Sequence, residues 1–303
     1  MHLSMIKDFL TDILIEPSNG LPLKLNSKGN LSTSAQSTEY RVIDDVPVVY
    51  TNTESVSSEI HSKNHSAFDY VSHYNNDAEY FDYFSKDEFK ATRIERERSR
   101  GAVISKVPLA AELILDIGCG GAWVAEYFIP KGKRVISVDI SLRNPVKALQ
   151  TVPHENHAAL VADAFHLPVK DGVLDVIIAS EIIEHVHDPK VFLSALISKL
   201  KKGGMIILVT PNDQQIVYNM CVHCNKPTPS DAHLHSFNKN NFNLYMPAGG
   251  KLISITSFSN KYLTKTKIYN ILNFLPFKAW RFVDRIANKV FGGASILLAV
   301  VQK

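Results

Sequence analysis

Three neighbouring side chains in this sequence could do chemistry because of their types and spacing. Glu181, Glu184 and His185 stand at positions i, i+3 and i+4 of an expected short helix, which puts them on one face. Such a group could hold a divalent cation, Mg²⁺ or Zn²⁺, that stabilises a deprotonated acceptor. Alternatively, His185 and Glu184 could act without metal, as a base or by positioning a substrate. Both are candidate catalytic residues, and the metal is left open.

A second group combines cysteine and histidine. Cys221 and Cys224 form a C-x-x-C pair, and His233 and His235 follow within the next eleven residues. Two thiolates and two imidazoles can meet the tetrahedral geometry of zinc, although the separations are not those of the usual fingers. The alternative is that this segment lines a substrate pocket and the cysteines are plain thiols.

A glycine-rich turn follows an apolar run at Asp116-Ile117-Gly118-Cys119-Gly120-Gly121 and precedes the helical stretch AWVAEYF. Glycines at a strand-to-helix turn let the backbone approach a ligand closely. The nicotinamide fingerprint requires glycine at position 123, where the chain has Trp123, and no Walker phosphate loop is present. The turn therefore predicts a cofactor other than a dinucleotide.

Acidic residues end the next apolar runs. Asp139 comes 23 residues after Asp116, where a carboxylate can accept both ribose hydroxyls of a nucleoside. Asp163 and Ala164 follow the third run, and Glu181 follows the fourth. Each of the first four apolar runs thus has a polar residue at its carboxyl end.

The elements that must position these residues alternate regularly. From Leu113 onward, short apolar runs are separated by helical stretches, which is typical of a mostly parallel sheet covered on both faces. We predict a doubly wound α/β fold with seven strands, at LILDIG, RVISVDI, AALVAD, LDVIIASE, GMIILVTP, LISITS and SILLAVVQK.

Three regions are expected along the chain. Residues 1–55 read as a small β-rich module with a helix over 6–15, and residues 56–85 as a linker with an aromatic cap in which Tyr74 and Tyr80 are candidate pocket residues. Residues 86–303 form the cofactor domain. Within it, residues 268–291 carry an apolar helical face with interspersed Lys and Arg, broken at Pro276. That segment could cover an apolar substrate, touch a membrane surface or pack on the sheet.

Five sequence blocks occur in a fixed order: LDIGCG, VDIS, ADAFHLP, EIIEHV and LKKGGMIILVTPN. With these blocks the sequence resembles the class I S-adenosylmethionine-dependent methyltransferases of the type 11 (UbiE/UbiG-like) group. The resemblance implies their Rossmann-like fold. The resemblance implies S-adenosyl-L-methionine as cofactor. It assigns the methionine end to Asp116, Gly118 and Gly120, the ribose to Asp139, and the adenine to Asp163 and Ala164. Glu181 would border the pocket, and Cys119 and Ile140 are further cofactor-binding positions. The E-x-x-E-H pattern is similar to that of quinone-biosynthetic and small-RNA O-methyltransferases, in which these residues are linked to a magnesium-type ion.

The front module is similar to short zinc-ribbon-like modules found beside methyltransferases. No cysteine precedes Cys119, so this copy cannot bind zinc through thiolates. The resemblance implies a docking or covering role.

The expected activity is transfer of a methyl group to an oxygen, nitrogen or carbon atom of a small molecule. An RNA methyltransferase is the first alternative, but the sequence lacks a basic stripe, and TPND at Asn212 is not an Asn-Pro-Pro-Tyr block. The second alternative is a cofactor-binding scaffold without activity, against which the complete set of Gly118, Gly120, Asp139 and Asp163 argues.

Composition limits the partners and the compartment. The formal net charge is only +3, from 33 basic and 30 acidic residues, which gives no strong nucleic-acid signal. Three cysteines do not form a disulfide framework, and no secretory signal or transmembrane run is recognised. We therefore expect a cytoplasmic protein.

Overall fold

The computed structural model describes residues 6–34, 38–50, 70–85, 89–222, 225–266 and 268–303. Its centre is a nine-stranded sheet in the order β13-β14-β10-β9-β6-β7-β8-β5-β4. Neighbours from β5 to β10 are parallel, whereas β4, β13 and β14 pair antiparallel. The strands are β4 (Val42–Ile43), β5 (Val46–Val49), β6 (Leu113–Ile117), β7 (Arg134–Asp139), β8 (His157–Ala162), β9 (Leu174–Ser180), β10 (Leu200–Pro211), β13 (Lys251–Asn260) and β14 (Ala294–Gln302).

The doubly wound, mostly parallel fold class is confirmed, and all seven predicted strands are present. The sheet is larger than expected because β4 and β5 of the front segment extend it beyond β8. Val48 and Val49 pair with Val161 and Ala162. This pairing covers an edge of β8 that would otherwise expose unpaired backbone groups.

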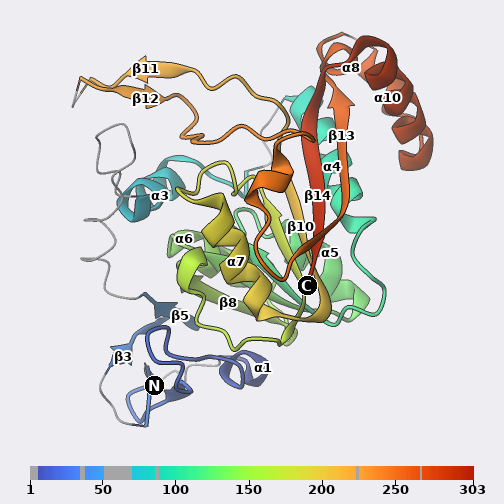
Figure 1. Cartoon of the computed structure of the whole chain (residues 1–303). Helices are drawn as coiled ribbons and strands as arrows, with labels where there is room; N and C mark the ends of the chain where they lie inside the picture. The colour runs from blue at the N-terminus through green and yellow to red at the C-terminus, as the bar shows by residue number, and fades with distance from the viewer. Residues whose placement is uncertain (1–5, 35–37, 51–69, 86–88, 223–224, 267) are drawn as a thin grey trace.

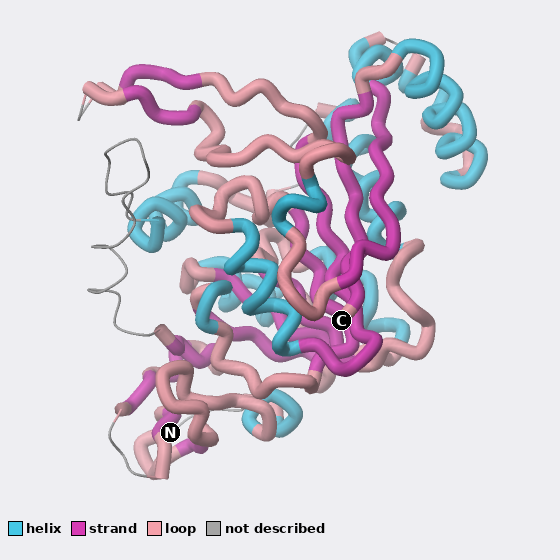
Figure 2. The backbone as a smooth tube through the Cα atoms, in the orientation of Figure 1, coloured by secondary structure: helices cyan, strands magenta, loops and turns pink. Residues whose placement is uncertain are grey.

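Helices cover both faces of the sheet, as Figure 2 shows. On one face, α7 (Pro189–Lys199) contacts β10, and its Phe192 and Leu196 belong to a core that also contains the even-numbered residues of β7 and β8. On the other face, α4 (Lys90–Ile104), α5 (Trp123–Phe128) and α10 (Phe277–Phe291) share a second core. There α6 (Arg143–Thr151) contacts β8. Successive strand residues point to opposite faces, so the apolar runs fill both cores.

The front segment packs on the first of these cores. It contains α1 (Asp8–Thr11) and a small antiparallel sheet of β1 (Lys24–Leu25), β2 (Leu31–Ser32) and β3 (Glu39–Tyr40). Leu10, Leu14 and Leu23 are fully buried in the same cluster as Leu160 of β8. The helix is shorter than predicted, and the expected boundary at residue 55 lies outside the described residues.

The remaining elements are short helices, turns and one hairpin that connect the strands of the sheet. They are α3 (Tyr70–Tyr80), β11 (Tyr218–Met220), β12 (Pro227–Pro229), α8 (Lys261–Lys265), α9 (Tyr269–Leu272) and the 3₁₀ turns Ile129–Lys131, Ala164–His166 and Phe242–Tyr245. Figure 1 places the front segment at one end of the molecule and the β11–β12 hairpin with α8 and α10 at the other. Among the helices of the described ranges, none has the length and apolar character needed to cross a bilayer.

We expect Leu14→Ala to destabilise the protein by about 2–5 kcal/mol, because it leaves a cavity in the shared core. Chemical denaturation of the full chain measures the change in unfolding free energy. Leu109→Ala removes the same atoms at a site that is 94% exposed and should cost little. Equal effects of the two substitutions would contradict the packing of the front segment on the sheet.

Candidate functional site

The predicted glycine turn lies where β6 ends and α5 begins. Gly118 has φ +71°, and a Cβ there would lie 2.1 Å from Cδ1 of Ile182. The backbone N–H groups of Gly118 and Cys119 both donate to the carbonyl of Val138 at the end of β7, at 2.8 and 3.0 Å. The turn is therefore held between β7 and the segment after β9, with room only for backbone.

Asp116 precedes this turn with its carboxylate buried. Burial raises its pKa well above the usual range, the charge of Asp139 adds to this, and the Arg100 guanidinium opposes it. Within the described part of the chain, its Oδ2 has no hydrogen-bond partner. A buried carboxylate oxygen without a partner is costly, and a cationic ligand group would satisfy it.

Asp139 ends β7 in a prepared orientation. Its Oδ1 accepts from the backbone N–H and the hydroxyl of Ser141, at 3.0 and 3.1 Å, and its Oδ2 accepts from Asn144 at 3.1 Å. Burial raises its pKa in spite of these bonds. The next residue, Ile140, accepts through its carbonyl from the hydroxyl of Tyr50. A carboxylate has further lone pairs, so Asp139 keeps acceptor capacity for ligand hydroxyls.

Asp163 follows β8 and is surrounded by protein donors. Its Oδ1 accepts from the backbone N–H of Phe165 at 2.9 Å, and its Oδ2 accepts from the Tyr70 hydroxyl at 2.9 Å. His166 Nδ1 lies 3.2 Å from the same Oδ2. Ala164 begins the 3₁₀ turn beside it. A ligand at Asp163 must share the carboxylate with Tyr70.

A cap made of residues 70–85 covers the glycine turn. A Cβ on Gly121 would lie 2.4 Å from the carbonyl oxygen of Tyr83, and a Cβ on Gly120 would lie 3.7 Å from the Tyr83 ring. Tyr74 of this cap is half-buried, and within the described part of the chain its buried hydroxyl has no hydrogen-bond partner. The prediction for Tyr80 is wrong, because this side chain is 88% exposed.

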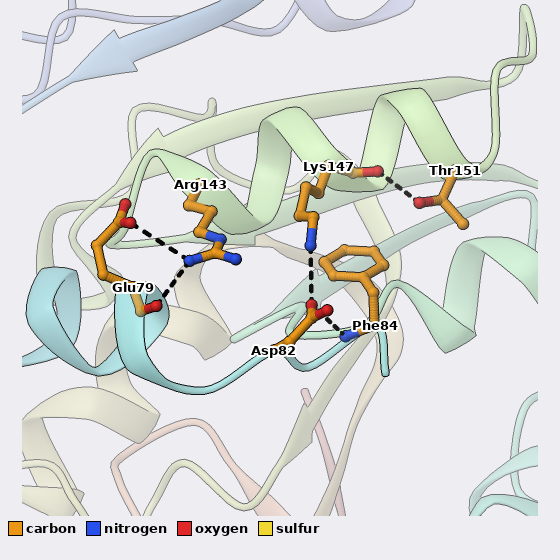
Figure 3. Close-up of polar contacts among 6 residues, drawn as sticks. All are labelled: Glu79, Asp82, Phe84, Arg143, Lys147 and Thr151. Carbon is orange, nitrogen blue, oxygen red and sulfur yellow. Dashed lines mark hydrogen bonds and ion pairs between the residues drawn. The ribbon is translucent and has the colours of Figure 1, made fainter. Parts of the chain in front are cut away.

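Polar contacts fasten the cap to α6, as Figure 3 shows. Arg143 donates to the carbonyl and to Oε2 of Glu79, at 2.8 and 3.3 Å. Lys147 pairs with Asp82 at 2.8 Å. A surface hollow of about 400 Å³ lies beside these contacts, but none of its lining residues is among the predicted cofactor residues. We therefore place the site at the strand ends, beneath the cap.

Glu181 and Glu184 follow β9 on a turn that is not the predicted helix. Glu181 adopts a left-handed φ of +55°, and His185 closes the turn by donating its N–H to the Ile182 carbonyl at 3.0 Å. Glu184 is buried, whereas Glu181 keeps contact with solvent. Desolvation raises the pKa of the Glu184 carboxyl, and the neighbouring charge of Glu181 adds to this. Partial desolvation by the surrounding protein raises the pKa of the Glu181 carboxyl as well.

His185 lies against two other rings. Its ring is edge-on to Tyr74 at 5.9 Å and to His233 at 4.6 Å, between centroids. Burial, followed by the charge of His233, lowers its pKa to about 4. Its Nδ1 lies 3.2 Å from the carbonyl of Ala232 and acts as the donor there, which leaves Nε2 with a free lone pair.

Glu184, His185 and His233 each offer one ligand atom, and these atoms lie within 4.8 Å of one another. Glu184 Oε2 accepts from the Thr210 hydroxyl at 2.9 Å, while its Oε1 has no partner among the described residues. Burial also lowers the pKa of His233. One carboxylate and two neutral imidazoles are a suitable ligand set for a divalent cation.

The predicted Cys/His group is distributed differently. His233 joins Glu184 and His185, whereas His235 lies 3.3 Å from the carbonyl of His187 through its Nε2. Cys221 follows β11 in the hairpin, and Cys224 lies outside the described residues. Zinc binding by the C-x-x-C pair stays a prediction. The sequence pattern could not reveal that His233, 48 residues downstream, completes the Glu184–His185 group.

Glu184→Gln should stabilise the metal-free protein, and more so as the pH rises. Because the pKa of Glu184 is raised in the folded state, ionisation above the ordinary pKa of about 4.5 disfavours folding, and glutamine removes this cost. Urea unfolding with chelator present, at several pH values from 5 to about 8, gives the difference from wild type. The exposed Glu126→Gln is the control. A difference that stays constant or shrinks with rising pH would contradict the buried-carboxylate assignment.

Comparison with known proteins adds a family match. The model of a methyltransferase domain family matches residues 61–257. The ubiquinone biosynthesis O-methyltransferase of Cereibacter sphaeroides is 34% identical over 122 residues, which cover 38% of this chain and 48% of that protein. The enzyme of the same name from Psychrobacter cryohalolentis is 30% identical over 131 residues, covering 39% and 51%. The aligned region thus spans about half the length of these curated relatives.

Among solved structures, a Listeria monocytogenes protein described as an S-adenosylmethionine-dependent methyltransferase aligns with a TM-score of 0.50 at 12% identity. The alignment covers 69% of this chain and 98% of that one. This likeness shows a shared fold.

Proposed function

This chain belongs to the methyltransferase domain family, and on that premise we propose that it methylates an oxygen atom of a small molecule with help from a divalent cation. It is an S-adenosylmethionine-dependent methyltransferase. The observation that carries the finer proposal is the group of Glu184, His185 and His233 beside the glycine turn. The O-methyltransferase names of the curated relatives agree with an oxygen acceptor.

We assign the cofactor to the carboxyl ends of β6, β7 and β8. S-adenosylmethionine supplies a methyl group already activated on a sulfonium, so the protein mainly binds and orients. Asp116 offers an unpartnered oxygen to a cationic ligand group, and Asp139 offers acceptor capacity to the ribose hydroxyls. The backbone of Gly118 to Gly120 allows close approach, while Asp163 serves the adenine together with Tyr70.

We assign the cation to Glu184, His185 and His233, with Glu181 adjacent. The fit rests on the unpartnered Oε1 of Glu184 and on two imidazoles kept neutral by burial. A bound cation would favour the deprotonated form of an acceptor hydroxyl. Without it, the neutral Nε2 of His185 is placed to accept the acceptor's proton. Tyr74 stands over this group with its hydroxyl free to contact an acceptor.

Asp139→Ala should weaken S-adenosylmethionine binding by about 10- to 100-fold, because it removes the charged acceptor for the ribose, at a cost of about 1–3 kcal/mol. Calorimetric titration with the cofactor and its demethylated product measures the loss. Asp171→Ala, an exposed carboxylate paired with Lys199, is the matched control. Unchanged affinity in a folded Asp139→Ala protein would remove the ribose assignment.

His233→Ala should abolish or strongly weaken binding of Mg²⁺, Mn²⁺ or Zn²⁺ to the purified protein, since it removes one of three close ligands. Direct calorimetric titration with each ion after chelation tests this, and the preferred ion identifies the metal. The exposed His154→Ala should bind like wild type. Wild-type metal affinity in His233→Ala would contradict the assignment of the cation to Glu184, His185 and His233. A separate assay of methyl transfer to small hydroxylated compounds tests the proposed oxygen acceptor.

A further inference from the structure

Residues 261–291 leave the sheet between β13 and β14 and form α8, α9 and α10, here called the helical projection. Asn260 at the end of β13 pairs with Ala294 at the start of β14, and Ile296 pairs with Pro211 at the end of β10. The projection therefore leaves the sheet at the carboxyl edge of the parallel strands. Figure 1 shows α8 and α10 extending past that edge.

One face of α10 anchors the projection to the protein. Trp280 is buried, with the Arg98 guanidinium 4.5 Å from the centre of its ring. Asp284 is also buried, and its carboxylate accepts from the backbone N–H groups of Ser259 and Asn260 at 3.2 and 2.8 Å. These contacts fix which face of α10 points outward.

The outward face of the projection carries large apolar side chains. Phe282, Ile286 and Val290 follow one another at four-residue intervals along α10, and all three are exposed. Ile271 and Phe274, in and after α9, are exposed as well, Phe274 to 88%. A cluster of exposed aromatic and aliphatic groups on one element marks an interaction surface.

The charge of this surface has one sign. Residues 261–291 contain seven Lys and Arg and one acidic residue, the buried Asp284, for a net charge of +6, while the whole chain carries +3. The rest of the chain is therefore net acidic. Lys278, Arg285 and Lys289 are exposed between the apolar residues of α10. Basic side chains interleaved with exposed apolar ones fit a surface that is anionic outside and apolar beneath.

A second apolar element extends from the same edge. The β11–β12 hairpin follows β10, and its strand β11 is exposed throughout. Tyr218, Met220 and Val222 are exposed, and Figure 1 shows the hairpin at the same end of the molecule as α8. A flat partner could meet the hairpin and the projection together.

We propose that the helical projection docks on the surface of an anionic phospholipid bilayer, with the apolar side chains entering the interface and the Lys and Arg side chains meeting lipid phosphates. The carboxyl edge of the sheet then faces the bilayer. A second copy of this chain fits less well, because two such surfaces would bring like charges together. The inference does not depend on which acceptor is methylated.

The experiment is flotation of the full chain with vesicles of phosphatidylcholine alone or mixed with phosphatidylglycerol. We expect binding to the anionic vesicles to exceed binding to neutral ones by about tenfold or more, and to fall as salt rises. The double variants Phe282→Ser with Ile286→Ser, and Arg285→Glu with Lys289→Glu, should each lose most of this binding. Two controls carry substitutions at exposed positions elsewhere and should bind vesicles like wild type. The double variant Leu109→Ser with Leu244→Ser matches the apolar change, and Glu126→Lys is the control for a change of charge.

Two results would overturn the proposal. One is failure of the wild-type protein to float with anionic vesicles. The other concerns the oligomeric state measured by light scattering. If the wild-type protein is a dimer, and the variant Phe282→Ser with Ile286→Ser is a monomer that still binds vesicles like wild type, the exposed face is an interface between copies of the chain. Circular dichroism and S-adenosylmethionine titration of each variant confirm the fold, since all four substituted residues are exposed and distant in sequence from the assigned cofactor residues.

Discussion

The structure depends most on the carboxylates gathered at one edge of the sheet. Asp116, Asp139 and Glu184 follow or end strands that are neighbours in the sheet, and burial raises the pKa of each. Desolvation disfavours the ionised form of each carboxyl, and the charge of Asp139 on Asp116 and that of Glu181 on Glu184 add to this. S-adenosylmethionine brings a sulfonium and an ammonium, and the Glu184 group suits a divalent cation. We interpret the site as a set of desolvated carboxyls whose ionised forms the proposed cationic ligands would stabilise, at the expense of stability in the ligand-free protein.

The cap is held over this edge by contacts of very different strength. The exposed pairs of Arg143 with Glu79 and of Lys147 with Asp82 are of the kind that contributes little free energy each. The Tyr70 hydroxyl and the Tyr83 backbone instead touch the parts of the site assigned to the cofactor. The surface pairs therefore contribute little to holding the cap against the glycine turn.

The sequence predicted those parts of the molecule that follow from local pattern. Seven apolar runs became seven strands, and the glycine turn and the acidic residues lie at one edge because parallel strands end together. The sequence did not predict contacts between residues that are far apart in the chain. Nothing near Val48 indicates pairing with Val161, and nothing near His233 indicates contact with His185. Tyr80 was misplaced because an aromatic run does not show which ring turns inward.

The segment after β9 places the glycine turn beside the group of Glu184, His185 and His233. Ile182 occupies the space that a side chain at position 118 would need, so it fixes the glycine turn from one side. Glu181 before it takes a left-handed conformation, which costs a non-glycine residue about 1–3 kcal/mol. That conformation lets the chain turn sharply enough for Glu184 to reach Thr210 and for His185 to reach His233. A regular helix from Glu181 would lack this turn, and the strain is therefore the local cost of joining the two halves of the site.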